Sequence, residues 1–254
     1  MTSSKGAVLV TGAARRIGRA MVIALAEDGY DVAIHYQTSR EEANATAAAA
    51  RQSGVKAEIC AADLLDRDAV EGLVETASSA LGQPLTTLIN NASIFDYDTI
   101  ATATPASWDR HFKSNLEAPF FLSQSFADQL PDGKEGSIIN MIDQRVRKLT
   151  PEFMSYTLAK SALWTFTQTA AQALAPQIRV NGIAPGPTMR GARQTEEHFR
   201  KQRAATLLGE GSSADGIVAA MRFILAAREV TGQLLCVDGG QHLGWKTPDI
   251  IGEE

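Results

Sequence analysis

The sequence contains little cysteine, no long apolar run and no strong excess of one charge. Cys60 and Cys236 are the only cysteines among 254 residues, and each lies in an apolar, strand-like stretch, which predicts neither a disulfide framework nor a metal site. No apolar run approaches the ~20 residues that span a bilayer, so no membrane association is expected. The net charge of −5 gives no reason to expect a nucleic-acid surface.

The N-terminal residues MTSSK lead directly into a strand-like segment and lack the charged, apolar and cleavage regions of a signal peptide. We therefore expect a cytoplasmic protein. Basic residues are scattered along the chain. Two small basic clusters, at 145–148 and 198–203, are predicted to form solvent-exposed faces.

Strand-like and helix-like segments alternate along almost the whole chain. Hydrophobic residues make up 44% and charged residues 21%, as in an ordinary globular protein. The expected strands lie at 7–11, 31–36, 56–63, 86–93, 136–142, 178–186 and 233–240. The expected helices lie near 17–28, 40–52, 66–80, 105–130, 153–174 and 213–227. This alternation predicts one α/β domain over residues 1–254, with a doubly wound parallel sheet of about seven strands and helices on both faces.

One segment, 187–215, is the most polar long stretch and is too irregular for a core element. We predict that it forms a mobile substrate lid with short helices. The C-terminal tail contains Trp245, which is expected either to line a pocket or to pack against a neighbouring subunit.

The first strand ends in a glycine-containing turn, TGAARRIG, which Gly12 and Gly18 frame. A strand, turn and helix in this order present free backbone N–H groups and a helix N-terminus to a pyrophosphate. Arg16 stands where the usual dinucleotide-binding pattern has a middle glycine. The alternative is an ordinary strand-to-helix connection, but the pair Arg15 and Arg16 favours a phosphate.

The end of the second strand, HYQTSR at 35–40, indicates which nicotinamide cofactor is bound. An acid there would accept a hydrogen bond from the ribose 2′-OH of NAD, yet no acid occurs before Glu41. The groups that suit a 2′-phosphate are Thr38, Ser39, Arg40 and Arg15. We therefore expect NADPH rather than NADH. The segment SREEA is also compatible with a helix N-cap that carries a capping-box glutamate, and both interpretations can hold.

Three further positions fit a cofactor cleft. Asp63 ends the third strand, where its carboxylate is expected to meet the adenine edge, and Leu64 follows it. The turn NNAS at 90–93 has small residues that allow the backbone to approach a cofactor closely. Asn115 is polar among apolar neighbours, so it is either a satisfied core amide or a residue that holds a water or a helix carbonyl near the lysine described next.

Tyr156 and Lys160 are four residues apart at the start of an apolar helix, so their side chains lie on one face. A phenol titrates near pH 10, and an adjacent ammonium is expected to lower its pKa into a useful range. Asp143 precedes them at the end of the strand SIINMI. Alone, this pair is as compatible with an interfacial tyrosine and a solvated lysine as with catalysis.

Together these motifs resemble the short-chain dehydrogenase/reductase family over nearly the whole chain. The resemblance rests on TGAARRIG at 11–18, the acid at 63, NNAS at 90–93, Asn115, the Tyr156–Lys160 pair and PGP at 185–187. It implies a Rossmann-type fold, a nicotinamide cofactor and an Asn–Ser–Tyr–Lys catalytic set, and the family usually forms homotetramers through long helices. The apolar faces at 116–126 and 158–170 permit such an assembly.

Asp143 stands where the common branch of that family has serine. With Arg16 and Phe95, it resembles the pteridine reductase and dihydromonapterin reductase branch, whose signature is TGxxxRxG with an Asp–Tyr–Lys set. This resemblance implies that Phe95 stacks on a pterin against the nicotinamide, although Phe95 is also compatible with a core or lid aromatic. Tyr97 is an alternative stacking residue.

The resemblance and the motifs together assign the expected sites. The catalytic residues are Asp143, Tyr156, Lys160 and Asn115. The residues expected to bind the cofactor are Gly12, Arg15, Arg16, Ile17, Gly18, Tyr36, Thr38, Ser39, Asp63, Leu64, Asn91, Ala92, Ser93, Tyr156, Lys160, Pro185 and Gly186. Those expected to bind a small-molecule substrate, a pterin, are Arg16, Ser93, Phe95, Asp143 and Tyr156.

The aspartate decides between two reactions. A ketone needs a hydrogen-bond donor at its oxygen, whereas an ionised carboxylate only accepts. Reduction of a pterin C=N bond instead needs a proton at nitrogen, which an Asp143–Tyr156 pair can deliver while Lys160 binds the nicotinamide ribose. We therefore expect an NADPH-dependent pterin reductase. The alternatives are a carbonyl reductase acting on 3-oxoacyl, sugar or other ketone substrates, and a non-catalytic binding protein.

Overall fold

The computed structural model describes residues 4–190 and 194–245. Seven strands form one parallel sheet in the order β3-β2-β1-β4-β5-β6-β7. The strands are β1 (Ala7–Val10), β2 (Asp31–Tyr36), β3 (Ala57–Ala61), β4 (Leu85–Asn90), β5 (Gly136–Met141), β6 (Ile178–Pro185) and β7 (Leu234–Val237). The predicted doubly wound, Rossmann-type sheet is confirmed.

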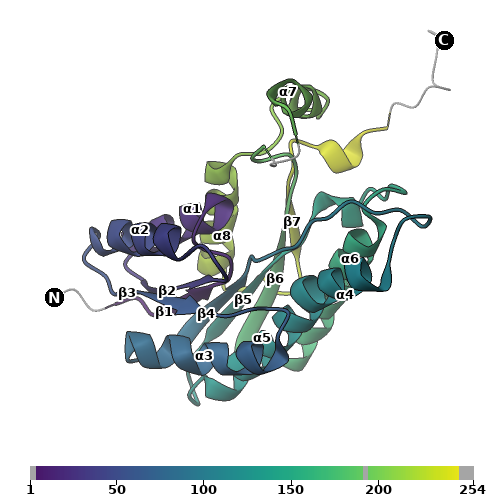
Figure 1. Ribbon diagram of the computed structural model, residues 1–254. Helices are drawn as coiled ribbons and strands as arrows, with labels where there is room; N and C mark the ends of the chain where they lie inside the picture. Colours follow the sequence, from purple (N-terminus) through teal and green to yellow (C-terminus); the bar gives the residue numbers. More distant parts are fainter. Residues whose placement is uncertain (1–3, 191–193, 246–254) are drawn as a thin grey trace, which may run out of the picture.

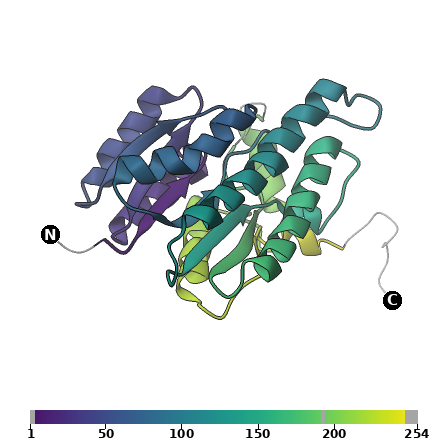
Figure 2. The ribbon, with the colours of Figure 1, turned by 90° about the horizontal axis from the view of Figure 1, so that it is seen from below.

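Helices cover both faces of the sheet, as Figures 1 and 2 show. One face carries α1 (Arg16–Glu27), α2 (Arg40–Arg51) and α8 (Ala214–Ala226). The other face carries α3 (Arg67–Leu81), α5 (Ala118–Gln129) and α6 (Met154–Ala173). Because both faces are covered, β1, β2 and β5 are buried along their whole length, and β1 consists of Ala, Val and Leu alone.

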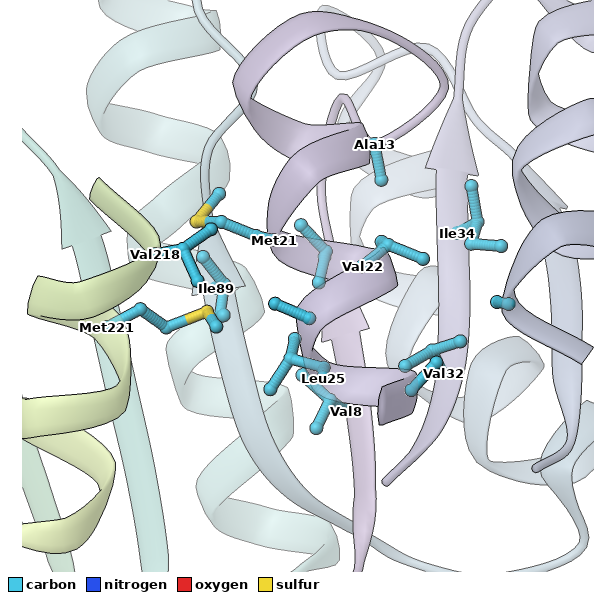
Figure 3. Packing of buried hydrophobic residues seen from close by; sticks show 14 of the residues in the cluster. Val8, Ala13, Met21, Val22, Leu25, Val32, Ile34, Ile89, Val218 and Met221 are labelled. Atoms are coloured by element: carbon cyan, nitrogen blue, oxygen red, sulfur yellow. The ribbon is translucent and has the colours of Figure 1, made fainter. Parts of the chain in front are cut away.

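The core on the first face forms where α1 packs between the sheet and α8. Figure 3 shows Met21, Val22 and Leu25 of α1 among strand residues such as Val8 and Ile34, with Met221 of α8 beside them. The spacing of these α1 side chains follows the helical repeat and gives the helix one apolar face. This packing holds the start of α1, and thus the glycine turn before it, at the edge of the sheet.

The expected single helix over 105–130 is interrupted. The structure has α4 (Pro105–Phe112), a five-residue π-helical turn over Lys113–Glu117, and then α5. Asn115 lies inside this turn and is fully buried. A π-helical turn inserts extra backbone into a helix and often occurs at functional sites. Periodicity in the sequence does not reveal such an insertion, because the apolar pattern continues on both sides.

The direction in which successive strands are added to the sheet changes between β1 and β4. At such a switch point the loops after the two strands diverge and leave a crevice at the carboxyl ends of the strands, where ligands of this fold bind. Gly12 follows β1 and Asn91 follows β4, so the predicted cofactor motifs meet at this crevice.

Among its described residues, the polar segment 187–215 contains α7 (Glu196–Ala204), none of whose residues is buried, and the first residues of α8. Residues 191–193 of this segment, and the part of the tail after Trp245, lie outside the described residues. Trp245 is 60% exposed. Within residues 4–190 and 194–245, no helix is long and apolar enough to cross a membrane, and no group of three or more His, Cys, Asp or Glu side chains is arranged to hold a metal ion.

Candidate active site

Gly12 and Gly18 bring the turn after β1 against the loop after β4. Gly12 has a φ of +61°, and a Cβ atom there would lie 2.9 Å from the Cα of Ala92. A Cβ on Gly18 would lie 2.7 Å from Nδ2 of Asn91 and still closer to the Gly12 carbonyl oxygen. Larger side chains would therefore push the two loops apart. Such a glycine turn leaves backbone N–H groups accessible to a phosphate.

Thr11 and Asn91 join the ends of β1 and β4. Thr11 Oγ1 accepts hydrogen bonds from the backbone N–H groups of Asn91 and Ala92, both at 2.9 Å. Asn91 Nδ2 donates to the Thr11 carbonyl oxygen at 2.8 Å and to the Gly12 carbonyl oxygen at 3.2 Å. These bonds fix the separation of the two loops, so the crevice between them is preformed.

His35 is a part of this cleft that sequence reasoning missed. Its Nδ1 accepts a hydrogen bond from the Gly12 N–H at 3.0 Å, and its Nε2 lies 3.1 Å from the Ala62 carbonyl oxygen. Because Nδ1 accepts, the ring proton is on Nε2 and is donated to Ala62. Burial lowers the pKa of His35 to about 4, which keeps the ring neutral at pH 7. The signal in the sequence was a histidine inside an otherwise apolar strand.

A cavity of about 440 Å³, the first cavity, lies along these loops. Its volume suits a small molecule or cofactor. Most of the residues that were predicted to bind a cofactor line this cavity, namely Gly12, Arg15, Arg16, Ile17, Gly18, Tyr36, Thr38, Ser39, Asp63, Leu64, Asn91, Ala92 and Ser93. The structure thus brings together residues from the ends of four strands, and the glycine turn and its exposed backbone suit a dinucleotide. Tyr156, Lys160, Pro185 and Gly186 do not line this cavity.

Of the groups expected to hold a 2′-phosphate, two hydroxyl groups and Arg15 line the first cavity, whereas Arg40 does not line it. The two hydroxyl groups belong to Thr38 and Ser39. Ser39 is the N-cap residue of α2, as the sequence allowed, but its side chain makes no capping hydrogen bond, so the expected capping box is not formed. Arg15 forms an exposed ion pair with Glu42 at 3.4 Å. Exposed pairs of this kind are weak, so the arginine can exchange this partner for a phosphate at little cost.

Arg16 lies between the first cavity and a second one. Its φ of +57° is in the left-handed region, which explains why a glycine is the usual residue at this place. The guanidinium donates to the carbonyl oxygens of Arg190 at 2.8 Å and Met189 at 3.0 Å. Arg16 therefore holds the start of the polar segment against the glycine turn, a contact that the sequence did not predict.

Tyr156 and Asp143 meet at the end of β5. The Tyr156 hydroxyl donates to Asp143 Oδ2 at 2.8 Å, and Asp143 Oδ1 accepts the Arg145 N–H at 2.8 Å. Lys160 donates from Nζ to the Met141 carbonyl oxygen at 2.7 Å. Three of the four predicted catalytic side chains are therefore within one polar cluster, although the lysine is directed at the strand rather than at the phenol.

Burial dominates the electrostatics of this cluster. It raises the pKa of Asp143, against the opposing hydrogen bonds from Arg145 and Tyr156 and the charges of Arg145 and Lys160. Burial and the neighbouring Asp143 raise the pKa of Tyr156 well above 10. Burial also lowers the pKa of Lys160 to about 8, against the attraction of Asp143.

The expectation that Lys160 lowers the pKa of Tyr156 is wrong for this arrangement. Lys160 Nζ lies 5.8 Å from the centre of the phenol ring and is bound to Met141. The carboxyl group of Asp143 contacts the phenol directly, so desolvation and negative charge together outweigh the charge of Arg145 and the hydrogen bond from Ser93, which lower the pKa of the phenol. The proton of Tyr156 is therefore firmly held and shared with an acid rather than released to solvent.

The side chain of Asn115 binds the backbone of the loop after β4. Its Oδ1 accepts the Ile94 N–H at 3.1 Å and its Nδ2 donates to the Ile94 carbonyl oxygen at 2.8 Å. This is the satisfied buried amide that the sequence left open as one alternative. Asn115 therefore positions the loop that carries Ser93 and Phe95, and its catalytic role stays a prediction.

The start of α6, which carries Tyr156, is held by a buried polar cluster that the sequence did not predict. Asp98 Oδ1 accepts the Ser155 N–H at 3.1 Å, and the Ser155 hydroxyl donates to Asp98 Oδ2. His111 Nδ1 lies 2.6 Å from the Ser155 hydroxyl. Phe153, at the N-cap, makes no side-chain cap bond, so Asp98 supplies the missing acceptor from a distant loop.

The second cavity, of about 230 Å³, lies beside Asp143. Phe95 and Asp143 line it, as predicted for substrate-binding residues, and Pro185 and Gly186 line it although they were predicted to bind the cofactor. Phe95 is stacked on Phe153, with ring centres 4.2 Å apart and planes inclined by 6°, and meets the Tyr156 ring edge-on at 4.6 Å.

Phe153 and Arg145 are site residues that sequence reasoning missed. Phe153 has a φ of +54°, a strained conformation for a residue with a side chain, and this turns its ring onto Phe95. Arg145 lines the second cavity, and its guanidinium lies 4.8 Å from the centre of the Phe153 ring. The expectation that the cluster at 145–148 is simply solvated is therefore wrong for Arg145.

Comparison with known proteins assigns the family. The model of the family described as short chain dehydrogenase matches residues 6–201. The chain belongs to this family. The resemblance predicted from the sequence is thus confirmed.

Two solved structures are closely similar to this short-chain dehydrogenase. FolM alternative dihydrofolate reductase 1 from Brucella canis, complexed with NADP, has a TM-score of 0.92 and 45% identity, covering 98% of each chain. The same-named protein from Brucella suis, also with NADP, has a TM-score of 0.94 and 46% identity, covering 97% of this chain and 99% of that one. These cofactors agree with the NADP(H) predicted from the sequence.

A sequence relative has a different named activity. The 3-oxoacyl-[acyl-carrier-protein] reductase FabG of Staphylococcus aureus is 31% identical over 241 residues, which cover 92% of this chain and 97% of that protein. The relatives therefore agree on an oxidoreductase of the short-chain family. They differ in the group that is reduced, so the substrate must be argued from the site.

Proposed function

We propose that this protein is an NADPH-dependent reductase of a pterin-type C=N bond, which converts a dihydropterin or dihydrofolate to its tetrahydro form. The observation that carries the proposal is the 2.8 Å hydrogen bond from Tyr156 to Asp143 at the edge of an aromatic-lined cavity. The similarity to two proteins named alternative dihydrofolate reductase, at 45% and 46% identity, supports the same reaction.

The carboxyl group of Asp143 favours an imine over a ketone. As a ketone accepts hydride, negative charge develops on its oxygen, and a carboxylate beside it would oppose that charge. Reduction of C=N needs a proton at nitrogen, and a carboxyl group whose pKa is raised by burial can hold that proton closer to neutral pH. The electrostatics of the site therefore match the second reaction.

NADPH, when bound in the first cavity, supplies the hydride. The residues of the chain then complete the proton balance. Tyr156, which donates to Asp143 Oδ2 at 2.8 Å in this structure, turns its hydroxyl proton to the ring nitrogen and accepts a replacement from the protonated carboxyl group of Asp143 across the same contact. Asp143 is reprotonated from water in the second cavity, which it lines. One hydride and one proton are thus added to the C=N bond.

Thr38, Ser39 and Arg15 are proposed to bind the 2′-phosphate of NADPH, and Lys160 the nicotinamide ribose. The pKa of Lys160 near 8 leaves most of the amine charged at neutral pH, while it also donates to the Met141 carbonyl oxygen. A charged amine held in this way would donate a hydrogen bond to a ribose hydroxyl of the bound cofactor. Asn115, Ser93 and the Pro185–Gly186 turn are proposed to shape the region between cofactor and substrate.

Phe95 is proposed to form the flat surface on which the pterin lies. Its ring lines the second cavity and is backed by Phe153, while its edge contact with Tyr156 places it beside the proton donor. An offset stack on an aromatic ring stabilises a heterocycle by about 0.5–1.5 kcal/mol beyond the area that is buried. Tyr97, which contacts Phe153 edge-on at 5.1 Å, supports this surface from the side.

A carbonyl reductase is the second candidate, favoured by the 31% identity to the 3-oxoacyl-[acyl-carrier-protein] reductase FabG. The two candidates are separated by measuring oxidation of NADPH and of NADH at a fixed pH with dihydrobiopterin, dihydromonapterin, dihydrofolate and a 3-oxoacyl thioester. We expect turnover with NADPH and at least one pterin. Turnover with the thioester alone would replace the proposal, and no turnover with any substrate would favour a non-catalytic protein.

The role of Asp143 is tested separately with Asp143→Ser. Serine donates a hydrogen bond but cannot carry a proton at neutral pH, so pterin reduction should fall by about 100-fold while any ketone reduction rises. Unchanged pterin turnover would exclude the carboxyl group from the proton path.

The homotetramer and the cytoplasmic location stay predictions. Phe120 and Leu158, in or beside the apolar faces predicted to assemble, are 43% and 47% exposed. Light scattering after size exclusion measures the oligomer directly, and a mass near that of one chain would exclude the assembly.

A further inference from the structure

Arg145 is positioned by both its backbone and its side chain at the wall of the second cavity. Its N–H donates to Asp143 Oδ1 at 2.8 Å, and its Nη1 donates to Thr150 Oγ1 at 2.7 Å. The guanidinium also lies over the Phe153 ring at 4.8 Å. These contacts limit the conformations of a long side chain, so a group that binds to it meets a partly ordered cation.

The charge of Arg145 is not neutralised by an ion pair among the residues that the structure describes. Asp143 is the sole acid among the described lining residues of the second cavity, and its two oxygens accept bonds from Tyr156 and from the Arg145 backbone. Arg16 is the other arginine that lines the cavity, and its guanidinium is occupied by two backbone carbonyl oxygens. Both guanidinium groups keep unused N–H donors, but Arg145 makes a single side-chain hydrogen bond to a described residue, Thr150, and is therefore the more available of the two cations.

A continuous series of ring contacts links this cation to the reaction centre. Tyr156 meets Phe95 at 4.6 Å, Phe95 stacks on Phe153 at 4.2 Å, and Phe153 lies under the Arg145 guanidinium at 4.8 Å. A flat ring bound beside Tyr156 and Phe95 would direct its substituent along this series. The substituent would then end near the guanidinium.

Resting on the proposed pterin reduction, we propose that Arg145 binds a carboxylate at the end of the substrate's substituent. A guanidinium forms two parallel hydrogen bonds with a carboxylate, which gives both affinity and orientation. The preferred substrates are then reduced-pterin compounds with an anionic substituent, of which dihydrofolate with its glutamate is an example. Neutral dihydropterins bind through the ring alone.

Arg147 provides a matched control on the same segment. It is exposed, its guanidinium lies 5.7 Å from the centre of the Trp164 ring, and it does not line the second cavity. Replacement of either arginine by glutamine removes one positive charge from the segment 145–147. A general effect of net charge on an anionic substrate would therefore appear in both variants, whereas direct binding appears in Arg145→Gln alone.

The experiment measures KM for dihydrofolate and for dihydrobiopterin with NADPH in the wild type, Arg145→Gln, Arg145→Lys and Arg147→Gln. The KM for dihydrofolate divided by the KM for dihydrobiopterin should rise about tenfold in Arg145→Gln and by less in Arg145→Lys. In Arg147→Gln this ratio should change by less than about twofold. In the wild type, added salt should raise KM for dihydrofolate more than for dihydrobiopterin. Circular dichroism and thermal unfolding show whether each variant is folded.

Two results separate the inference from the function on which it rests. If the wild type reduces both pterins and the KM ratio is unchanged in Arg145→Gln, or changes equally in Arg147→Gln, the assignment of Arg145 is overturned and pterin reduction stands. If the wild type reduces no pterin, the proposed function fails and the assignment fails with it. Should Arg145→Gln not fold, the ratio in Arg145→Lys decides, since loss of the planar guanidinium must still raise it.

Discussion

The two cavities meet at Arg16 and Ile17 but are built in different ways. The first cavity is shaped mainly by backbone: glycine turns, the bonds of Thr11 and Asn91, and the contact of His35 with Gly12. The second is shaped by side chains that come from distant parts of the sequence and are held by stacking and by strained backbone at Phe153.

This difference matches the ligands proposed for the two cavities, a dinucleotide in the first and a substrate in the second. A pyrophosphate is the same in every dinucleotide, so preformed backbone donors at the ends of strands are sufficient to bind it. A substrate varies between members of one family, so its site is built from side chains that change without disturbing the sheet. Substitutions in the first cavity should therefore affect every reaction of this protein, and those in the second should affect particular substrates or the chemical step.

The largest effect is expected in the second cavity, from Asp143→Asn. Reduction consumes a proton, so the protonated form of Asp143 is the competent one, and its raised pKa extends this form to higher pH. In the wild type, kcat/KM should fall about tenfold per pH unit once the pH exceeds that pKa. Asparagine does not titrate, so the variant should lose this pH dependence and about 100-fold of its activity at the optimum.

The measurement is kcat/KM for the best pterin from about pH 4.5 to about pH 9, together with the dissociation constant of NADPH by fluorescence. If kcat/KM of Asp143→Asn still falls with rising pH as it does in the wild type, the titrating group is not Asp143. A large loss of NADPH binding would show that the two cavities are not separate in function.

The next effect is expected in the first cavity, from Gly18→Ala. The added methyl group would overlap the Gly12 carbonyl oxygen and approach Asn91 Nδ2 to 2.7 Å, so the turn must open. Overpacking of this kind costs about 2 kcal/mol, which corresponds to about a 30-fold weaker binding of NADPH. The loss of NADPH affinity should be the same whichever substrate is present. Titration of the protein with NADPH, followed by NADPH fluorescence, measures this affinity.

Gly72→Ala is the matched control, because nothing lies within 4 Å of a Cβ at this position of α3. That variant should bind NADPH normally and gain about 0.5–1 kcal/mol of stability from the better helix former. Equal affinity for NADPH in the two variants would contradict a first cavity shaped by glycine.

The smallest effect concerns His35→Gln and the pH dependence of stability. The folded-state pKa of His35, about 4, lies below the ordinary value of 6.5, so below pH 6.5 the unfolded chain takes up a proton that the folded chain does not. Stability is therefore lost as the pH falls from 6.5 toward 4. At about pH 5.5 the loss is on the order of 1 kcal/mol, or about 3 °C in Tm for a chain of this size.

Glutamine can accept from Gly12 and donate to Ala62 without titrating, so Tm of His35→Gln should fall less steeply between about pH 7 and pH 5 than Tm of the wild type. His198→Gln, at an exposed position of α7, is the control and should follow the wild type. Parallel Tm curves for all three proteins would show that the His35 contact does not titrate as described.

The parts that sequence reasoning predicted correctly depend on local pattern. Alternating apolar segments led to the sheet and its helices, and Gly12, Gly18 and Asn91 lie where the motifs placed them. The spacing of Tyr156 and Lys160 placed both side chains in one cluster with Asp143. These features can be predicted from the sequence because they depend on residues that are close along the chain, or on motifs that recur in one fold.

The parts that it missed depend on neighbours that are distant in sequence. The residues around Arg145 in the sequence do not predict that the Phe153 ring lies under its guanidinium. The residues around Phe153 do not predict its positive φ. The π-helical turn around Asn115 was hidden because apolar residues continue through it. The direction of the Tyr156 pKa shift was missed because burial is a property of the packed molecule.

The amino-acid order alone was enough to specify the strand–helix alternation, the glycine turn and the tyrosine–lysine pair, since backbone preferences and residue spacing act over a few positions. Folding in three dimensions was needed to set which proton is held, which arginine lines the second cavity beside Asp143 and which histidine supports the turn. Desolvation and contacts between remote segments exist only once the sheet has brought those segments together.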